Sequence, residues 1–377
     1  MTIHVVSSGE TVYSISRQYA VSTDSIIYNN QLTYPYTLAI GQALLISTYT
    51  ESSPTQAVVT NGFAYPFIQE YALYNTLPFL TRLSVFSYGF TSEGYLIPPQ
   101  IDDTPLIQAA INNGSAPFLT LTPFGPDGKF NNTLITQVIN NPAAIEQLIE
   151  ELIYVINTRG FQGVDIDFEY ILASDRIAFA SFVREVREAV NLLGYPVTVD
   201  LAPKTSDDQA GLLYEGKDYA LLGEAANEVL LMTYEWGYTY SEPMAVAPIP
   251  NVRRVVEYAL TRIPAEKINL GIPNYGYDWP LPYEKGITAA TTIGNVEAVR
   301  LAVENNVPIQ FDERSMSPYF QYTKNGVMHE VWFEDVRSMQ AKFQIVKDYG
   351  LHGMGYWQIM RLFRANWLLL ADQFYIL

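Results

Sequence analysis

Beyond about residue 57, short apolar runs rich in β-branched and aromatic residues alternate with segments whose apolar residues recur at helical spacing. This alternation is typical of an α/β fold in which crossover helices join the strands of a parallel sheet. Eight runs qualify as strands: 58–64, 82–90, 116–122, 163–169, 197–202, 228–234, 268–273 and 353–358. Eight such strands predict a closed (β/α)8 barrel.

The helices that flank the run at 163–169 have the clearest amphipathic pattern. Asn141 is suited to cap the first of them, Pro142 to its first turn and Gly160 to its end, and Gly194 stops the second. The apolar positions are 145, 148, 149, 152, 153 and 156 in the first helix and 179, 182, 183, 186 and 190 in the second. Stripes of this kind are buried against a sheet.

Residues 1–47 form a smaller pattern of their own. Its elements are a strand at 3–6, a helix with Val12, Ile15 and Tyr19 on one stripe, a helix at 23–29 and a strand at 43–46. This order predicts a small βααβ domain. The polar stretch 48–56 predicts a short linker, which leaves 57–377 for the barrel.

The stretch from about 274 to 335 is too long for a simple barrel loop and contains strand-like pieces at 317–323 and 327–333. We therefore predict an α+β insertion after the seventh strand. An insertion in this place would wall one side of a groove.

Composition restricts the chemistry. At 377 residues and 49% hydrophobic, the chain can bury a large core, and no apolar run reaches the roughly 18 residues of a membrane span. The first residues have neither the basic nor the long apolar region of a Sec signal, so we expect none. With no cysteine, and with His4, His329 and His352 scattered, we expect no metal site, no Ser-His-Asp triad and no cofactor.

The net charge of −17 argues against nucleic acid or an anionic membrane as a partner, because both are bound through basic patches. A neutral or weakly charged partner is expected. The chain contains 28 Tyr, 18 Phe and 5 Trp, which are flat side chains able to stack on sugar rings. The oligomeric state is left open.

The run at 163–169 carries three acids, Asp165, Asp167 and Glu169, at every second position. Because successive strand side chains point to opposite faces, the acids share one face and the apolar residues between them share the other. Neighbouring buried carboxyl groups share protons, since they cannot all ionise cheaply, so Glu169 should have a raised pKa and act as a general acid. The alternative is an edge strand with a solvated acidic face, which the apolar flanks disfavour.

Gln162-Gly163-Val164-Asp165-Ile166-Asp167-Phe168-Glu169 resembles the D-x-x-D-x-D-x-E signature of family 18 glycoside hydrolases, the chitinase-like TIM barrels, with Gln162 at the first acid. The resemblance implies that Glu169 protonates the glycosidic oxygen while the N-acetyl oxygen of the sugar attacks. Asp167 would hold the acetamido N–H, and Asp165 would share its proton. The outcome would be retention, with Glu169 then activating water.

Further segments resemble motifs of the same family. Leu230-Leu231-Met232-Thr233-Tyr234-Glu235-Trp236-Gly237 is similar to its M-x-Y-D motif. The match implies that Tyr234 donates to the acetamido oxygen and that Met232 and Trp236 contact the sugar. Glu235 stands where many members have Asp.

The last strand places Trp357 where the family keeps an indole beneath the cleaved sugar. Gly271-Ile272-Pro273-Asn274-Tyr275-Gly276-Tyr277 resembles G-I-P-F-Y-G-R, so Tyr275 is a candidate sugar contact and Tyr277 replaces an Arg. The rings of Tyr65 and Trp279 are further candidates for the cleft.

Residues 4–12, 26–30 and 38–44 resemble a LysM domain. The resemblance implies that N-acetylated sugars of peptidoglycan or chitin lie in a shallow groove between the turn at 9–11 and the loop at 29–38. The implied contacts are Gly9, Glu10, Thr11, Asn29, Leu38 and Ile40. A capping subdomain without a ligand is the alternative.

Together with Pro243-Met244-Ala245-Val246-Ala247-Pro248, these motifs resemble the spore cortex-fragment lytic glucosaminidases of endospore-forming bacteria. The resemblance implies a peptidoglycan hydrolase that cleaves β-1,4 bonds after N-acetylglucosamine and lies in the spore coat or cortex. One alternative is a chitinase acting on chitin oligomers. The other is a sugar-binding coat protein without activity.

Overall fold

The computed structural model describes residues 1–48, 54–125 and 128–377. Most of the predicted linker at 48–56 therefore lies outside the described residues. No helix in the described part of the chain is both long and apolar enough to cross a membrane.

Over the described ranges, eight parallel strands close into a barrel in the order β3-β16-β10-β9-β8-β7-β6-β4, and β4 pairs back to β3. The barrel strands are β3 (Ala57–Ala64), β4 (Arg82–Phe90), β6 (Ala116–Leu121), β7 (Val164–Ile166), β8 (Val197–Leu201), β9 (Glu228–Leu231), β10 (Ile268–Pro273) and β16 (Gly353–Trp357). Two short strands, β5 (Leu96–Ile97) and β17 (Tyr375–Ile376), pair with β4 and β3 in the described part of the sheet. The predicted (β/α)8 barrel is confirmed.

Strands β7 and β9 end earlier than predicted. The chain leaves the ladder soon after Ile166, although the backbone N–H of Asp167 still donates to Leu121 O at 3.0 Å. Glu169, predicted as the last residue of its strand, therefore lies three residues beyond β7. The ladder stops because the residues beyond it turn into the loops at the barrel mouth.

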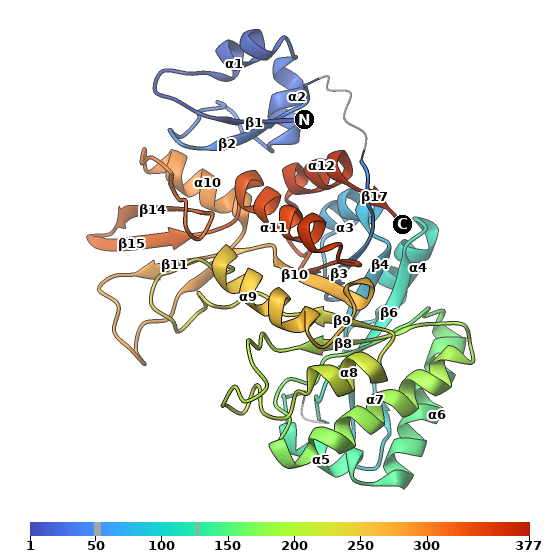
Figure 1. The fold of residues 1–377 in the computed structure, drawn as a ribbon. Coiled ribbons are helices and arrows are strands. Elements are labelled where there is room, and N and C mark those ends of the chain that lie inside the picture. The colour runs from blue at the N-terminus through green and yellow to red at the C-terminus, as the bar shows by residue number, and fades with distance from the viewer. Residues whose placement is uncertain (49–53, 126–127) are drawn as a thin grey trace.

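Helices cover the outside of the barrel (Figure 1). They are α3 (Glu70–Thr76), α4 (Thr104–Asn112), α5 (Asn132–Ile139), α6 (Pro142–Arg159), α7 (Arg176–Asn191), α8 (Tyr219–Ala225), α9 (Ile249–Leu260), α11 (Val336–Tyr349) and α12 (Arg364–Gln373), with short 3-10 turns η1 (Leu77–Phe79), η2 (Ala173–Asp175) and η3 (Ala265–Lys267). Gly160 ends α6 in the left-handed conformation, as predicted, with φ 86°. Asn141 occupies the N-cap position of α6, but its side chain makes no capping hydrogen bond.

The apolar face of the acidic segment anchors it to the helical layer. Phe168 is fully buried and stacks on Phe179 and Phe182 of α7, with ring centroids 5.7 Å apart in each pair. Burying an aromatic side chain of this size contributes roughly 1.5–3 kcal/mol. This packing turns the alternate residues, the acids, toward the barrel interior and its mouth.

The N-terminal unit has the predicted βααβ order, with β1 (Thr2–Val5), α1 (Val12–Tyr19), α2 (Thr23–Asn29) and β2 (Ala43–Ile46). Strands β1 and β2 are antiparallel. Thr11 caps α1 by accepting a hydrogen bond from Ser14 N at 3.1 Å. The small core contains Val6, Val12, Ile15, Ile26, Leu44 and Ile46.

This unit lies on the barrel next to α10, α11 and α12 (Figure 1). Ile309 N donates to Ile40 O at 2.8 Å. The guanidinium of Arg364 donates to Tyr28 O at 3.1 Å and lies 4.0 Å from the centroid of the Tyr28 ring. Leu45 joins the main core of the barrel. The unit is therefore docked against the barrel through polar and apolar contacts.

The predicted insertion after the seventh strand is confirmed as an α+β element. In the part of the chain that is described, its antiparallel sheet has five strands in the order β12-β11-β15-β14-β13. They are β11 (Gly276–Pro280), β12 (Thr291–Ile293), β13 (Gln310–Asp312), β14 (Ser317–Lys324) and β15 (Val327–Trp332), and α10 (Asn295–Glu304) packs beside them.

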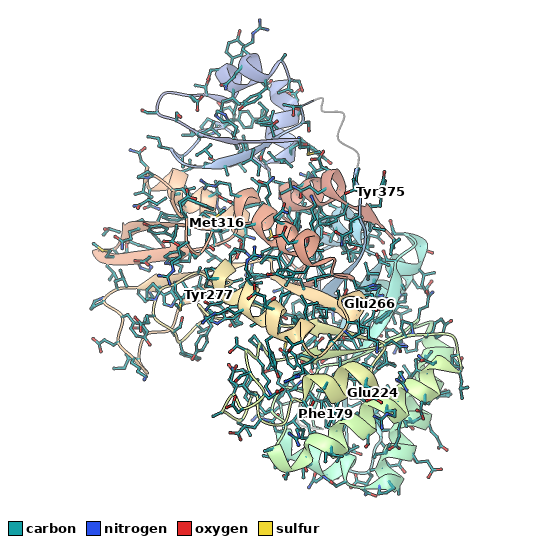
Figure 2. All side chains as sticks on the ribbon, in the orientation of Figure 1. Phe179, Glu224, Glu266, Tyr277, Met316 and Tyr375 are labelled. Carbon is teal, nitrogen blue, oxygen red and sulfur yellow. The ribbon has the colours of Figure 1, made fainter. Side chains whose placement is uncertain are left out.

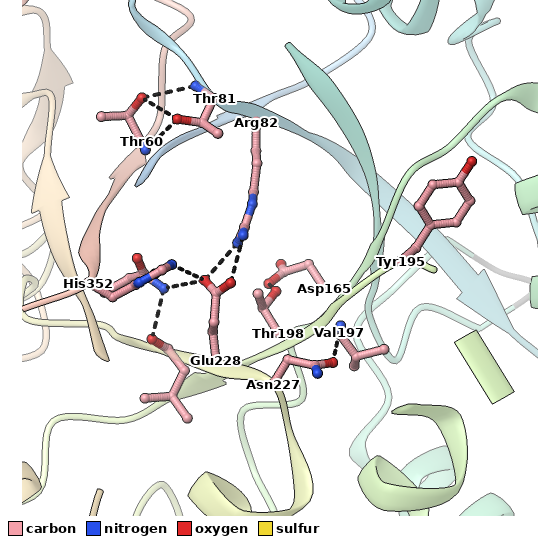
Figure 3. A network of polar contacts seen from close by, with 12 residues as sticks. Thr60, Thr81, Arg82, Asp165, Tyr195, Val197, Thr198, Asn227, Glu228 and His352 are labelled. Carbon is pink, nitrogen blue, oxygen red and sulfur yellow. Dashed lines mark hydrogen bonds and ion pairs between the residues drawn. The ribbon is translucent and has the colours of Figure 1, made fainter. Parts of the chain in front are cut away.

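An ion pair crosses the barrel interior near the amino ends of the strands (Figure 3). Arg82 opens β4 and Glu228 opens β9, and the guanidinium donates to both carboxylate oxygens at 2.7 and 2.6 Å. Asn269 donates a further hydrogen bond at 3.0 Å. Burial alone would raise the pKa of Glu228, but His352 and Arg82 hold it well below its usual range.

Candidate active site

A cleft of about 650 Å³ opens where the barrel strands end. It is lined by Phe63, Phe86, Asp167, Glu169, Tyr170, Asp200, Pro203, Leu213, Tyr214, Met232, Tyr234, Glu235, Trp236, Tyr238 and Trp357. Most of these residues lie at the carboxyl end of a barrel strand or in the loop after it. The cleft therefore occupies the face of the barrel on which enzymes of this fold carry their active sites.

Most of the residues predicted to contact substrate meet in this cleft. The predicted residues among its lining are Asp167, Glu169, Met232, Tyr234, Glu235, Trp236 and Trp357. Asp165, Tyr65 and Tyr275 lie next to the lining residues rather than among them. These three residues therefore surround the cleft without lining it.

Asp167, Glu169 and Asp200 form the acidic part of the cleft. Asp167 and Asp200 are 6% and 3% exposed, and Glu169 is half-buried. Burial raises the pKa of Glu169, and Lys217 opposes that shift. Burial also raises the pKa of Asp167 well above its usual range, and the charges of Glu169 and Asp165 add to the effect. The protonated forms of these carboxyl groups are therefore favoured more than in free side chains.

Asp165 lies beneath the cleft inside the barrel, where it is 1% exposed. The hydroxyl of Thr198 on β8 donates to its carboxylate. Burial raises the pKa of Asp165 to about 6, against the opposing effects of Thr198 and Arg82.

A lysine lies buried beside the acids. Lys217 is fully buried, and its ammonium donates to Asp200 O at 2.6 Å and lies 5.5 Å from the centroid of the Phe179 ring. Burial lowers the pKa of Lys217, while the charges of Asp167 and Asp200 oppose that shift. Lys217 thus provides a cation that limits how far the pKa values of the acids rise.

Glu235 is held by tyrosines at the side of the cleft. It is exposed, has a φ of 67°, and its carboxylate accepts hydrogen bonds from Tyr275 and, at 2.9 Å, from Tyr277. Tyr277 comes from β11 of the insertion (Figure 2). Although the residue as a whole is exposed, desolvation of its carboxyl group raises the pKa of Glu235, the tyrosines lower it, and the charge of Glu169 raises it further. The Tyr hydroxyls orient this carboxylate.

Tyr234 completes the polar wall of the cleft and is 9% exposed. Burial raises the pKa of its hydroxyl well above the usual value, and the charges of Asp200 and Asp167 add to the shift. The hydroxyl therefore stays protonated and can donate a hydrogen bond to a ligand.

Trp357 packs in an aromatic cluster at the floor of the cleft. Its ring centroid is 4.9 Å from that of Phe86 and 6.2 Å from that of Tyr65. Tyr65 in turn stacks on the exposed Phe67 at 5.1 Å. The prediction that Trp279 could line the cleft is wrong, because this residue is fully buried and its indole N–H donates to Ser241 O at 2.8 Å.

The residues predicted to bind sugar in the N-terminal unit have mixed surroundings. Gly9 and Ile40 are exposed, Leu38 is half-buried and Thr11 is exposed while it caps α1. Their contact with sugar stays a prediction.

Two residues of the same set make bonds inside the unit. Glu10 accepts hydrogen bonds from Ser7 N at 2.6 Å and from His4, and the bond from Ser7 lowers the pKa of Glu10 more than any other contact. Asn29 is buried, and its amide donates to Ser47 at 2.8 Å. This bond joins the end of α2 to the segment after β2.

Asp200 and Lys217 were missed by the sequence reasoning. Asp200 could have been found, because it alternates with Thr198 along β8 and so shares the inward face of the strand next to the acidic one. Lys217 lies in the segment before α8, where no periodicity marks it. Tyr170, Tyr214 and Tyr238 are in loops and were also missed. No metal-binding group of three or more His, Cys, Asp or Glu occurs in 1–48, 54–125 and 128–377.

Clustered carboxyl groups in an aromatic-walled cleft at the mouth of a (β/α)8 barrel define the class of the protein as a glycoside hydrolase. Residues 125–361 match the family described as glycosyl hydrolases family 18, and residues 4–47 match the LysM domain. The chain belongs to glycoside hydrolase family 18 and carries a LysM domain at its N-terminal end.

Relatives resemble the chain over its whole length. A cortical fragment-lytic enzyme of Bacillus subtilis (strain 168) is 34% identical, over 99% of this chain and 98% of that protein. A cortical fragment-lytic enzyme of Bacillus anthracis is also 34% identical, over 99% and 98%. The crystal structure of the Bacillus cereus spore cortex-lytic enzyme SleL has a TM-score of 0.95 and 31% identity, and covers 100% of this chain and 99% of that one.

Proposed function

We propose that this protein hydrolyses β-1,4 glycosidic bonds on the reducing side of N-acetylglucosamine in spore cortex fragments of peptidoglycan, with retention of configuration. The observation that carries the proposal is the cleft that brings Glu169, Asp167 and Tyr234 together with Trp357. The substrate class is supported by relatives named for lysis of cortical fragments, which are similar across the whole chain.

Glu169 is the general acid. Burial raises the pKa of its carboxyl group, which favours the protonated form that a general acid needs. The glycosidic oxygen accepts this proton as the bond to the sugar breaks. The same carboxylate then takes a proton from the attacking water, which restores the acid.

The acetamido oxygen of the sugar is the internal nucleophile, so no protein carboxylate needs to bond to the sugar. Asp167 accepts a hydrogen bond from the acetamido N–H, and Tyr234 donates one to the acetamido oxygen. The raised pKa values of Asp167 and Asp165 suit them to share a proton while the positive charge develops and disappears. Trp357 forms the apolar floor against which the sugar ring stacks.

The LysM domain binds N-acetylated glycan and keeps it near the barrel, and the protein acts in the coat or cortex of an endospore. The contacts between Arg364 and the LysM domain support a fixed position of this domain on the barrel. The relatives named as spore cortex enzymes support the location.

Product analysis on purified cortex fragments tests this function. Wild-type protein should release new reducing ends after N-acetylglucosamine, whereas Glu169→Gln should lower the rate by at least about 10²-fold, because Gln cannot donate the proton. Glu146→Gln on the exposed face of α6 is the matched control and should keep the wild-type rate. The proposal fails if mass spectrometry finds no new reducing ends, or if Glu169→Gln turns over as fast as Glu146→Gln. Chitooligosaccharides assayed in parallel separate a chitinase from a peptidoglycan hydrolase.

A further inference from the structure

A second hollow lies between the LysM domain and the barrel. Its volume is about 920 Å³, larger than the cleft over the acids. One wall is the loop from α2 to β2, with Gln31, Thr33 and Tyr34, and the other wall is α10, with Val299 and Arg300. We call this hollow the interdomain groove. Its lining shares the loop at 30–37 with the predicted LysM sugar site, but it includes neither the turn at residues 9–11 nor the acids of the cleft.

A smaller hollow of about 230 Å³ lies between the groove and the end of β16. It shares Asn295, Val296, Glu297 and Phe363 with the interdomain groove. At its other side is Asn274, whose backbone N–H donates to Trp357 O at 2.9 Å. Together the two hollows therefore extend from the end of β16, which carries Trp357 at the floor of the cleft, to the LysM domain.

The linings of the two hollows include amide groups that make fewer hydrogen bonds within the protein than they can. Asn295 is 3% exposed, and its carbonyl oxygen accepts from Glu334 N at 3.0 Å. Its amide nitrogen has no hydrogen-bond partner among the described residues, and neither has the side-chain oxygen of Asn274. A buried amide without a partner costs free energy of about 1–3 kcal/mol. Both atoms are themselves shielded from solvent, so a rotation of either side chain would bring them to the hydroxyl and acetamido groups of a glycan, which donate and accept.

The two walls of the groove are fixed to each other. A Cβ atom on Gly41 would lie 1.9 Å from Ile309 O, so the LysM backbone is in direct contact with the segment after α10. Arg337 of α11 donates to Gly41 O at 3.2 Å. A glycan in the groove would therefore contact the LysM domain and the barrel together, without a prior closing motion of the two parts.

From these observations we propose that the interdomain groove binds a further stretch of the same N-acetylated glycan strand that enters the cleft. The substrate class rests on the proposed function, whereas the place of the site rests on the hollows and on the unused amides. Tyr34, which is 85% exposed at the edge of the groove, supplies a ring on which a sugar can stack. Long glycans gain affinity from this groove, and disaccharides held in the cleft do not.

Calorimetric titration of the full chain tests the proposal, with Glu169→Gln as background so that the ligand is not cleaved. The probes are the hexamer and the dimer of N-acetylglucosamine. Val299→Trp places an indole in the groove, and Leu301→Trp makes the same change on α10 outside the lining. Thr37→Trp fills the groove from the exposed LysM loop, where a large side chain does not disturb a core.

The hexamer should bind about tenfold more weakly to Val299→Trp and Thr37→Trp than to Leu301→Trp. Equal hexamer affinity in all three variants would contradict a glycan site in the groove. So would a parent protein that does not prefer the hexamer over the dimer. Because these are binding measurements, they decide the question even if the hydrolysis assay on cortex fragments fails. If the wild-type protein cleaves cortex fragments but the three variants bind the hexamer equally well, the proposed function stands and only the glycan site in the groove is contradicted.

Discussion

At the scale of single residues, the cleft depends on several carboxyl groups whose charges oppose one another. Asp165, Asp167, Glu169 and Asp200 all have raised pKa values because each is buried, and the charges of neighbouring acids add to the shift for Asp167 and Asp200. The buried Lys217 opposes these shifts for Asp167, Asp200 and Glu169. The protonation state of the row therefore reflects the whole cluster rather than any one acid.

Lys217→Met tests this balance. Loss of the cation removes the effect that lowers the pKa of Glu169, so that pKa should rise further. A general acid works only while it is protonated, and the alkaline limb of the kcat profile should therefore move to higher pH. Lys267→Met is the control, because this lysine also donates to backbone carbonyls but lies near the amino ends of the strands. An alkaline limb at the same pH in Lys217→Met and wild type would contradict the assigned role.

Some of these residues were predictable from local patterns and others were not. The alternation of Asp165, Asp167 and Glu169 with apolar residues indicates a shared face, and the structure places these acids together. Lys217 is hidden from such reasoning, because its burial comes from tertiary packing against Phe179 rather than from its own segment. Tyr275 was a candidate through the resemblance, but its hydrogen bond to Glu235 joins distant segments and is not visible in either of them.

At the scale of elements, strand and helix identities follow from the periodicity, whereas their ends depend on pairing. Strand β10 has the predicted bounds, but β7 is shorter than the predicted run because its ladder ends where the chain turns over the barrel mouth. Helix α6 begins and ends as the Pro142 and Gly160 signals predict. The docking of the LysM domain was not predictable in detail, because it depends on surfaces that no periodicity describes.

Gly41→Ala tests that docking. Gly41 has φ 81°, and an added Cβ would lie 1.9 Å from Ile309 O. Gly9→Ala is the matched control, since Gly9 has φ 83° and nothing within 4 Å of the added atom. Both changes should cost about 1 kcal/mol through the left-handed backbone. Only Gly41→Ala should also speed hydrogen exchange at the amide of Ile309, which donates to Ile40 O. Equal exchange in the two variants would show that the LysM domain is not held at this contact.

At the scale of the whole molecule, the two ends of the barrel have different electrostatic roles. Near the amino ends of the strands, Arg82 and Glu228 form a bidentate ion pair across the barrel interior (Figure 3). Near the carboxyl ends, burial raises the pKa of the acids to which we assign the proposed chemistry. The ion pair therefore lies at one end of the barrel and the proposed chemistry at the other, which agrees with the usual division in this fold.

Glu228→Gln should reduce the free energy of unfolding by about 3 kcal/mol at pH 7, because it leaves the Arg82 guanidinium buried without its anion. The pKa of Glu228 is lowered in the folded state, so its stabilisation is present above the unfolded pKa and is lost as pH falls. The difference between wild type and variant in urea unfolding should therefore shrink below about pH 4. A difference that stays constant down to pH 3 would exclude the ion pair as its source.

The configuration of the first product tests the central claim most directly. If Glu169 donates the proton and the acetamido group of the sugar is the nucleophile, proton NMR during the first minutes of cleavage should detect the β-anomer of the new reducing end before mutarotation. The α-anomer as first product would mean direct attack by water on the sugar, and it would contradict the account.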